Sequence, residues 1–409
     1  MSIRVFKRLL FSITAVTLLA APVCGQSTPK KVRMDIDKAK TYIKSGKDFD
    51  KAEKLMTDLL KDSANHDNIK IYDTWYESVL GQYNAANEKL YLKQKYDTAA
   101  FYNLISHLQE VAIELDNLDA RPDKKGRVRL SYRKENAAFL NMLRINIYYG
   151  GTWSVRKGDY KKGFDYFDDY LDAAHQPFYE EYRYQQRDSL LPVAAYWATL
   201  CGYKLQDAER TLKHCQLAMT DESKANFVLQ YMCEAYQWQK NDSDYLRTLT
   251  EGYERFPEYP YFFPRLADYY SEKGQYEKVL QLADRGLDIK QDGTLFLLAK
   301  SVALLNLDRY EECIETSRML MELKDASPEP YFNIATCYLN QALAVEKERE
   351  PRKNHQRLQK LYREARPFME DYRRLAPEDK QRWAPALYRI YLNLNMGKQF
   401  EEIDRLMHK

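Results

Sequence analysis

The side chains that most often carry catalysis and metal binding are scattered along this sequence. A histidine pair spaced as in H-E-x-x-H would hold a zinc ion on one helix face, and a cysteine beside a histidine would form a nucleophile. Neither arrangement occurs, and the chain has no glycine-rich phosphate loop and no G-x-S-x-G turn. The histidines are His66, His107, His175, His214, His355 and His408. We therefore expect no catalytic, cofactor-binding or metal-binding residues, and no enzyme activity.

One aromatic segment, Tyr148–Trp153 (YYGGTW), is of a kind that lines sugar-binding sites. Its two glycines fit better as small residues where two helices cross, because Gly158 and Tyr160 follow at a spacing that recurs along the chain. The alternative is an exported all-helical toroid that acts on or binds polysaccharide, whose catalysis would need two carboxylates about 5–10 Å apart on long loops. The short, glycine-poor turns of this chain argue against such loops.

The cysteines fit helix contacts better than a disulfide framework. Beyond Cys24 they form an odd, sparse set without C-x-x-C or zinc-ligand spacing: Cys201, Cys215, Cys233, Cys313 and Cys337. We expect them to serve as small apolar side chains in helix packing. One disulfide between a spatially adjacent pair remains the alternative.

The first residues are typical of a secretory signal peptide. Arg4, Lys7 and Arg8 precede an uncharged apolar run that ends in small residues near Gly25. We predict cleavage after Gly25 and export, most simply to a bacterial periplasm. The alternative is lipid anchoring through Cys24, although the residues before this cysteine depart from the usual lipoprotein pattern.

Composition beyond the signal favours helices and gives no electrostatic basis for nucleic-acid binding. The chain has only 14 glycines and 14 prolines in 409 residues, too few for many hairpins or long loops. Its 63 basic and 60 acidic residues balance once the three cations of the signal are removed. No later stretch has the roughly 20 apolar residues of a spanning helix. We expect a nearly all-helical mature chain without a transmembrane segment and without a nucleic-acid partner.

A pattern of large, small and aromatic residues recurs every 34 positions. It places two helices on either side of Gly274, each with apolar residues at three- or four-residue spacing. The first helix carries, in successive copies, Leu229, Met232, Cys233 and Tyr236, then Phe263, Leu266, Ala267 and Tyr270, then Leu297, Lys300, Ser301 and Leu304, then Tyr331, Ile334, Ala335 and Tyr338. Within the third of these copies, only Lys300 departs from the pattern. The second carries Tyr276, Val279, Ala283 and Gly286, then Tyr310, Cys313, Ser317 and Leu320, and after an insertion Tyr362, Ala365, Met369 and Tyr372.

This pattern, closed by Pro257 and Pro377, resembles the tetratricopeptide repeat (TPR) family, most clearly from about residue 225 onward. The resemblance implies an all-α fold, a right-handed α-solenoid of seven to eight antiparallel helix pairs. Together with the predicted signal peptide, it implies an exported bacterial scaffold that binds a protein or peptide partner and catalyses no reaction. The small residues sit where paired helices cross, and the tyrosine after the turn fills the wedge between neighbouring pairs.

Interruptions of the period suggest the domain organisation. We predict a signal peptide over 1–25, degenerate helical hairpins over 26–120, a basic linker over 121–134, and the main array over 135–409 with insertions near 176–190 and 344–358. The segment 121–134 has seven basic residues and one acidic residue, and contact with an anionic surface is the alternative to a solvated linker.

In the family, a concave groove lined by the first helix of each pair receives partner segments. Carried over by position, it offers Tyr196, Tyr203, Gln230, Glu234, Gln237, Trp238, Asp268, Glu272, Asn306 and Asn340. The lysines with which some members clamp a peptide carboxylate are missing, since Gln230, Pro264 and Leu298 occupy such positions. Trp238 beside Tyr196 and Tyr203 is the predicted hot spot, and packing between helix pairs is the alternative role of these rings.

Overall fold

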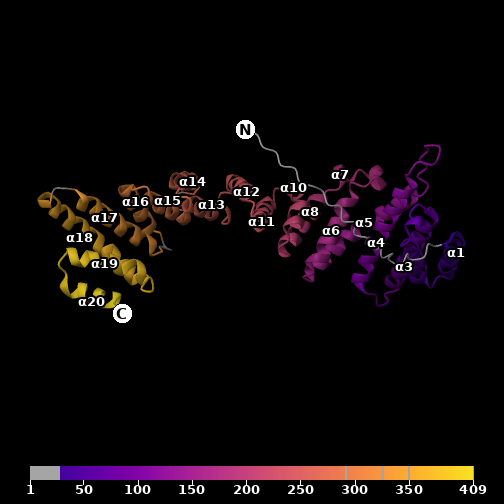
Figure 1. The fold of residues 1–409 in the computed structure, drawn as a ribbon, viewed down its shortest axis with the longest axis horizontal. Coiled ribbons are helices and arrows are strands. Elements are labelled where there is room, and N and C mark those ends of the chain that lie inside the picture. Colours follow the sequence, from indigo (N-terminus) through magenta and orange to yellow (C-terminus); the bar gives the residue numbers. More distant parts are fainter. Residues whose placement is uncertain (1–27, 291–292, 324–326, 349–350, 409) are drawn as a thin grey trace, which may run out of the picture. The chain divides into compact units, whose positions relative to one another are not determined.

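The computed structural model describes residues 28–290, 293–323, 327–348 and 351–408; the predicted signal peptide and Cys24 lie outside these residues. The protein is 79% helical, without strands in the described ranges. Contacts divide it into two compact units, one up to Cys201 and one from Gly202 (Figure 1). None of the helices described is both long and apolar enough to cross a membrane.

In the first unit, consecutive helices pack against one another from α1 to α6. A short insertion, η2 and α7, then precedes α8, whose last residues belong to the second unit. The helices are α1 (Pro29–Ser45), α2 (Phe49–Leu59), α3 (Ile69–Tyr91), α4 (Thr98–Asp119), α5 (Arg133–Arg156), α6 (Tyr160–Ala173), η2 (Pro177–Tyr182), α7 (Tyr184–Arg187) and α8 (Leu191–Lys204), with the 3₁₀ turn η1 (Ser63–Asn65) between α2 and α3.

In the second unit, α9 packs mainly on α11, and from α11 to α20 each helix packs mainly on its neighbours in sequence, so the predicted all-α solenoid of helix pairs is confirmed. The helices are α9 (Ala208–Lys213), α10 (Cys215–Ala218), α11 (Ala225–Trp238), α12 (Asp242–Arg255), α13 (Phe262–Glu272), α14 (Tyr276–Ile289), α15 (Thr294–Asn306), α16 (Tyr310–Met321), α17 (Glu329–Lys347), α18 (Pro351–Leu375), α19 (Lys380–Asn393) and α20 (Gly397–Met407).

In four successive repeats the turn between the paired helices is built around a left-handed residue. Gly274 has φ 65°, and Gln206, Lys240 and Asp308, at 34-residue offsets from it, have φ 54°, 55° and 57°. In each case the next N–H donates to the carbonyl five residues earlier, as from Gln275 to Tyr270 at 2.8 Å, which closes the preceding helix. The repeated element is therefore a backbone conformation, and glycine is only one of the residues that adopt it.

A glycine in the second helix of a pair lets the next helix pair pack closely against it. A Cβ built on Gly252 would lie 2.3 Å from the Phe262 ring, and one on Gly286 would lie 2.5 Å from the Phe296 ring. Glycine and phenylalanine are 10 residues apart in both cases, and the two contacts are 34 residues apart. We call each such contact a glycine–phenylalanine lock. The missing side chain lets the first helix of the next pair seat its ring against the second helix of the previous pair.

The five cysteines described are all buried, as the helix-packing interpretation predicts. Cys313 of α16 is fully buried, and its thiol donates to the Ser301 carbonyl of α15 at 3.2 Å. Burial raises the pKa of the Cys201 thiol to about 12, so this thiol stays protonated at neutral pH.

The insertion near 344–358 lengthens α17 and α18 beyond a standard repeat. Ala342, just before the insertion, and Val345 within it are buried, and the Asn354 amide donates to the Val345 carbonyl at 3.1 Å. The extra turns therefore have a small packed interior of their own.

Candidate protein-binding surface

Three aromatic rings form a stack at the start of the second unit. The Tyr203 ring, at the end of α8, lies 4.4 Å from the Tyr231 ring with an interplanar angle of 21°. The Tyr203 ring also stacks on Trp238, with ring centroids 6.1 Å apart and an interplanar angle of 19°. Tyr231 and Trp238 are two turns apart on α11, so one face of this helix presents both rings. We call Tyr203, Tyr231 and Trp238 the aromatic stack.

The aromatic stack is half-open to solvent. Tyr231 is buried, whereas Tyr203 and Trp238 are partly exposed. The Lys204 ammonium lies 5.6 Å from the Tyr203 ring centroid, within the range of a cation–π contact. Gln237, adjacent to Trp238 in the chain, is exposed. Tyr203 and Trp238, two of the three residues of the predicted hot spot, therefore contribute to packing between helix pairs and also leave ring surface exposed.

Two predicted groove residues are engaged by the next helix pair. The Tyr259 hydroxyl donates to Gln230 Oε1 at 2.5 Å, and the Tyr261 hydroxyl donates to Glu234 Oε1 at 2.8 Å. The Arg265 guanidinium lies over the Tyr261 ring at 3.7 Å and is 3.8 Å from the Glu234 carboxylate. Burial, together with the bond to Glu234, raises the pKa of Tyr261 well above its ordinary value. Gln230 and Glu234 thus fix the α11–α13 junction.

The remaining predicted positions differ in exposure. Asp268 and Glu272 are exposed one turn apart on α13. Asn306 is exposed and its amide donates to the Val302 carbonyl of its own helix at 2.8 Å. Asn340 is partly buried. Tyr196 belongs to the first unit, where its ring packs on Trp197 with centroids 5.6 Å apart.

The extended helix pair borders a groove that the position-by-position comparison missed. This groove has a volume of about 700 Å³ and lies among α16, α17 and α18. Tyr310 and Tyr338 supply aromatic surface, while Arg357 pairs with Glu348 at 2.9 Å on its rim. The sequence signal was the insertion itself, because the added turns extend past the preceding pair. Positions carried over from the TPR family cannot identify groove residues in this insertion, because the standard repeat has no equivalent of it.

The first unit contains a histidine held between two carboxylates. His107 Nε2 donates to Glu53 Oε1 at 2.7 Å, and His107 Nδ1 donates to Glu110 Oε2 at 3.2 Å. The hydrogen bonds to Glu110 and Glu53 raise the pKa of His107 to about 9, so the imidazole is cationic at neutral pH. An imidazolium whose two nitrogens are both hydrogen-bonded to carboxylates forms structural ion pairs. It is poorly suited to act as a base.

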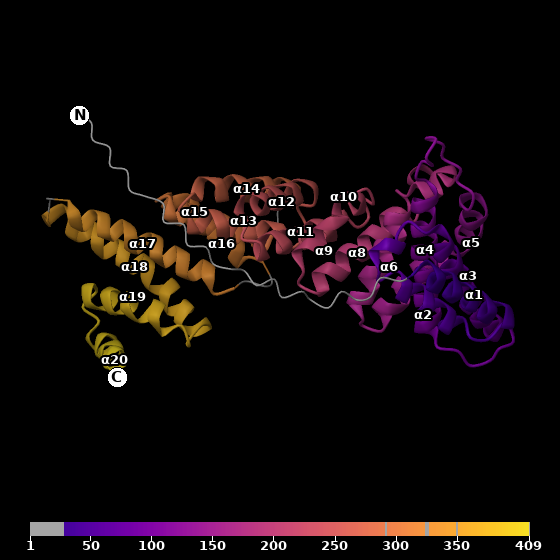
Figure 2. The ribbon, with the colours of Figure 1, turned by 45° about the vertical axis from the view of Figure 1, so that its right-hand side comes forward.

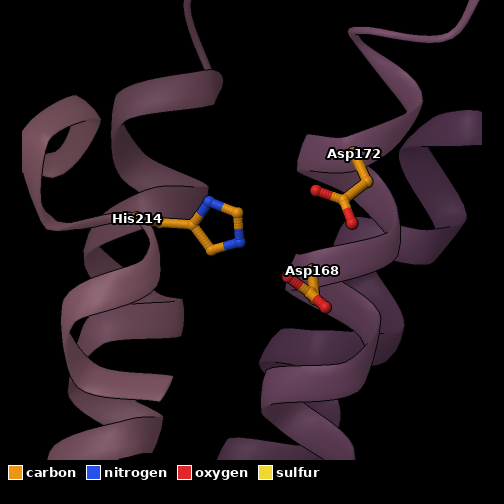
Figure 3. Close-up of side chains that lie close together, drawn as sticks. All are labelled: Asp168, Asp172 and His214. Carbon is orange, nitrogen blue, oxygen red and sulfur yellow. The ribbon is translucent and has the colours of Figure 1, made fainter. Parts of the chain in front are cut away.

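Two aspartates share one side of α6. Asp168 and Asp172 lie one turn apart and their carboxylates project from the same face of the helix (Figure 3). Such an acidic pair is a common feature of solvated helices and does not define a metal site by itself. Neither residue was predicted as a ligand from the sequence.

No protein-family model matches the sequence, and no curated protein matches it as a relative. The C-terminal part of a TPR repeat-containing protein from Cytophaga hutchinsonii is similar in structure, with 12% identity, coverage of 63% of this chain and 92% of that one, and a TM-score of 0.42. A TPR repeats protein from Bacteroides fragilis has 15% identity, coverage of 64% and 98%, and a TM-score of 0.32.

The TPR domain of P58(IPK) is also similar, with 12% identity, coverage of 90% of this chain and 99% of that one, and a TM-score of 0.28. The 34-residue pattern, the left-handed turns and the pairwise packing are features of the chain itself. Several solved TPR-repeat proteins are therefore similar in structure to this all-helical chain.

Proposed function

We propose that this protein is a non-catalytic scaffold that binds a segment of another protein through the aromatic stack and the adjoining first-helix face of the second unit. The half-open Tyr203 and Trp238 rings carry this proposal. Aromatic side chains with a buried base and an exposed face dominate the energetics of protein interfaces. Here Tyr203 is already held by packing on Tyr231, and Trp238 stacks on Tyr203, so binding loses little side-chain entropy.

The exposed charges of α8 and α13 would set the orientation of a bound partner and its association rate. Lys204 lies on one side of Tyr203, and Asp268 and Glu272 are exposed on α13. Exposed rim charges steer encounter and contribute modestly to affinity. We expect the rings to determine the dissociation rate and the charges to determine how the association rate depends on salt.

The proposed place of action is outside the cytoplasm. The basic, apolar and small segments of residues 1–25 support export and cleavage, with the mature chain in a periplasm. Lipid anchoring at Cys24 is the alternative. The proposed partner is then an exported protein or the exported part of a membrane protein.

An affinity pull-down of the mature chain from envelope extract, read by mass spectrometry, tests the proposal. We compare the wild type with a Tyr203→Ala, Trp238→Ala double variant. A protein recovered with the wild type and lost with the double variant supports binding at the aromatic stack. Equal recovery with both would indicate that the interface lies in an insertion. Recovery of glycan alone would favour the polysaccharide alternative.

A matched control separates loss of the surface from loss of the fold. Trp238→Phe keeps an aromatic ring at the stack and should retain the partner. Glu315→Ala changes an exposed residue of α16 and should have no effect. Circular dichroism of each variant should superimpose on that of the wild type. A double variant with reduced helicity would make the single variant Trp238→Ala, set against Trp238→Phe, the deciding comparison.

A further inference from the structure

The segment between α4 and α5 is a structured basic projection. It extends beyond the ends of both helices (Figure 2), and residues 121–129 are all exposed. Asp123 closes the turn by accepting from the Lys125 N–H at 2.8 Å and from the Arg127 N–H at 3.0 Å. Gly126 follows with φ 75°. The projection therefore has a defined apex over residues 124–129.

The charges of this segment divide into two groups. Arg121, Arg127 and Arg133 pair with the aspartates Asp67, Asp123 and Asp116, which fixes the base of the segment and its turn. Lys124, Lys125 and Arg129 at the apex are exposed. Within the part of the chain that the structure describes, no carboxylate pairs with these three cations. The only acidic residue of the segment, Asp123, is already used by the turn and by Arg127.

An apolar side chain lies among these cations. Val128, between Arg127 and Arg129, is 51% exposed. A narrow projection cannot enclose a ligand, and it fits a surface that is flat on its scale. This combination of cations and an exposed apolar side chain suits a bilayer interface. There the burial of apolar area and the electrostatic attraction to charged headgroups both contribute to the binding free energy. Phosphate polymers would use the cations but not the valine.

We infer that the apex 124–129 docks the protein on membranes containing anionic phospholipid, with Lys124, Lys125 and Arg129 at the headgroups and Val128 in the interface. This contact is separate from the aromatic stack and adds a tether to the proposed scaffold function. It requires no spanning segment. The contact is reversible, because a few cations and one apolar side chain give weak adsorption.

Vesicle co-sedimentation of the full mature chain tests this inference. We compare phosphatidylcholine vesicles with vesicles that also contain phosphatidylglycerol. Binding is expected only to the second kind and should weaken as salt rises. A Lys124→Glu, Lys125→Glu, Arg129→Glu triple variant should bind about a hundred-fold more weakly, since each cation near an anionic surface contributes about a five-fold factor.

The matched control is a Lys30→Glu, Lys31→Glu, Lys47→Glu variant, which makes the same change in net charge at exposed positions elsewhere in the first unit. It should bind at least ten-fold more tightly than the apex variant. Equal losses in the two variants would overturn the inference, because net charge alone would then explain adsorption. Failure of the wild type to bind phosphatidylglycerol vesicles would also overturn it.

Val128→Ser separates a lipid surface from an anionic polymer. It should weaken vesicle binding several-fold and leave retention on a heparin column unchanged. Wild-type binding to heparin with no valine-dependent binding to vesicles would assign the apex to an acidic polymer and contradict the lipid assignment. Because Val128 is exposed, its substitution should not alter folding, which thermal unfolding of the variant checks.

Discussion

Single glycines determine how closely neighbouring helix pairs approach. Phe262 is fully buried against Gly252, so its ring cannot move aside for an added methyl group. We expect Gly252→Ala to destabilise the second unit by about 1–3 kcal/mol, because overpacking outweighs the gain of about 1 kcal/mol in helix propensity. Urea unfolding measures the change.

Gly397→Ala is the matched control for this substitution. A Cβ on Gly397 would have no atom within 4 Å. Its free energy of unfolding should therefore stay within about 0.5 kcal/mol of the wild type. A Gly252→Ala variant as stable as this control would mean that the glycine–phenylalanine lock contributes no packing constraint.

The ion pairs of His107 predict a pH dependence. The pKa of His107 is about 9 in the folded chain and near 6.5 in the unfolded chain, so folding favours the charged imidazole. This stabilisation is fully present below pH 6.5 and is lost as the pH rises toward 9. Since solvent reaches 33% of the side chain, we expect it to amount to about 1–2 kcal/mol.

His107→Gln should remove this dependence. The free energy of unfolding of the wild type should fall between pH 6.5 and pH 9 relative to that of the variant, as measured by urea unfolding at several pH values. Parallel pH profiles for the two proteins would show that His107 is not held as a cation by Glu53 and Glu110.

At the residue scale, the sequence identified many packing positions and few polar roles. Phe263, Ala267 and Cys233 were predicted as core residues from their spacing and are buried. The bonds of Glu234 and Gln230 to Tyr261 and Tyr259 were not predicted. They join residues about 30 positions apart, and helical periodicity does not report which polar partner the next pair supplies.

The turn between paired helices is the element that repeats most faithfully. Lys240 adopts φ 55°, where a side chain costs roughly 1–2 kcal/mol relative to its usual conformations. We expect Lys240→Gly to stabilise the protein by about 0.5–1 kcal/mol and Gly274→Ala to destabilise it by about 1 kcal/mol. Chemical unfolding of both variants checks the opposite signs, and two changes of the same sign would refute the shared turn.

Sequence reasoning recognised this turn only where glycine marks it. Gln206, Lys240 and Asp308 adopt the same backbone conformation, but their residue types do not predict it. The helix pairs themselves were predictable because apolar spacing depends on burial, which every pair needs. The break in the period predicted an insertion near 344–358, whereas the length of α18 and the groove beside it depend on the three-dimensional course of both helices.

At the scale of the whole molecule, stability is distributed over neighbouring contacts within each unit. Ile403 is fully buried in the last pair, and Ile403→Ala should cost about 2–5 kcal/mol there. Because repeat stacks transmit stability mainly between neighbours, hydrogen exchange should accelerate in α19 and α20 and remain unchanged in α1–α6. Uniform acceleration along the chain would indicate one global cooperative unit.

The central claim is that a protein partner contacts the aromatic stack. Site-specific photocrosslinking in the native envelope tests it most directly, with the photoreactive residue placed at the exposed Gln237 or, as a control, at the exposed Glu315 of α16. We predict a discrete protein adduct from Gln237 that is absent from Glu315 and disappears when Trp238→Ala is added. Absence of an adduct at Gln237, or the same adduct from both positions, would contradict the proposed binding surface.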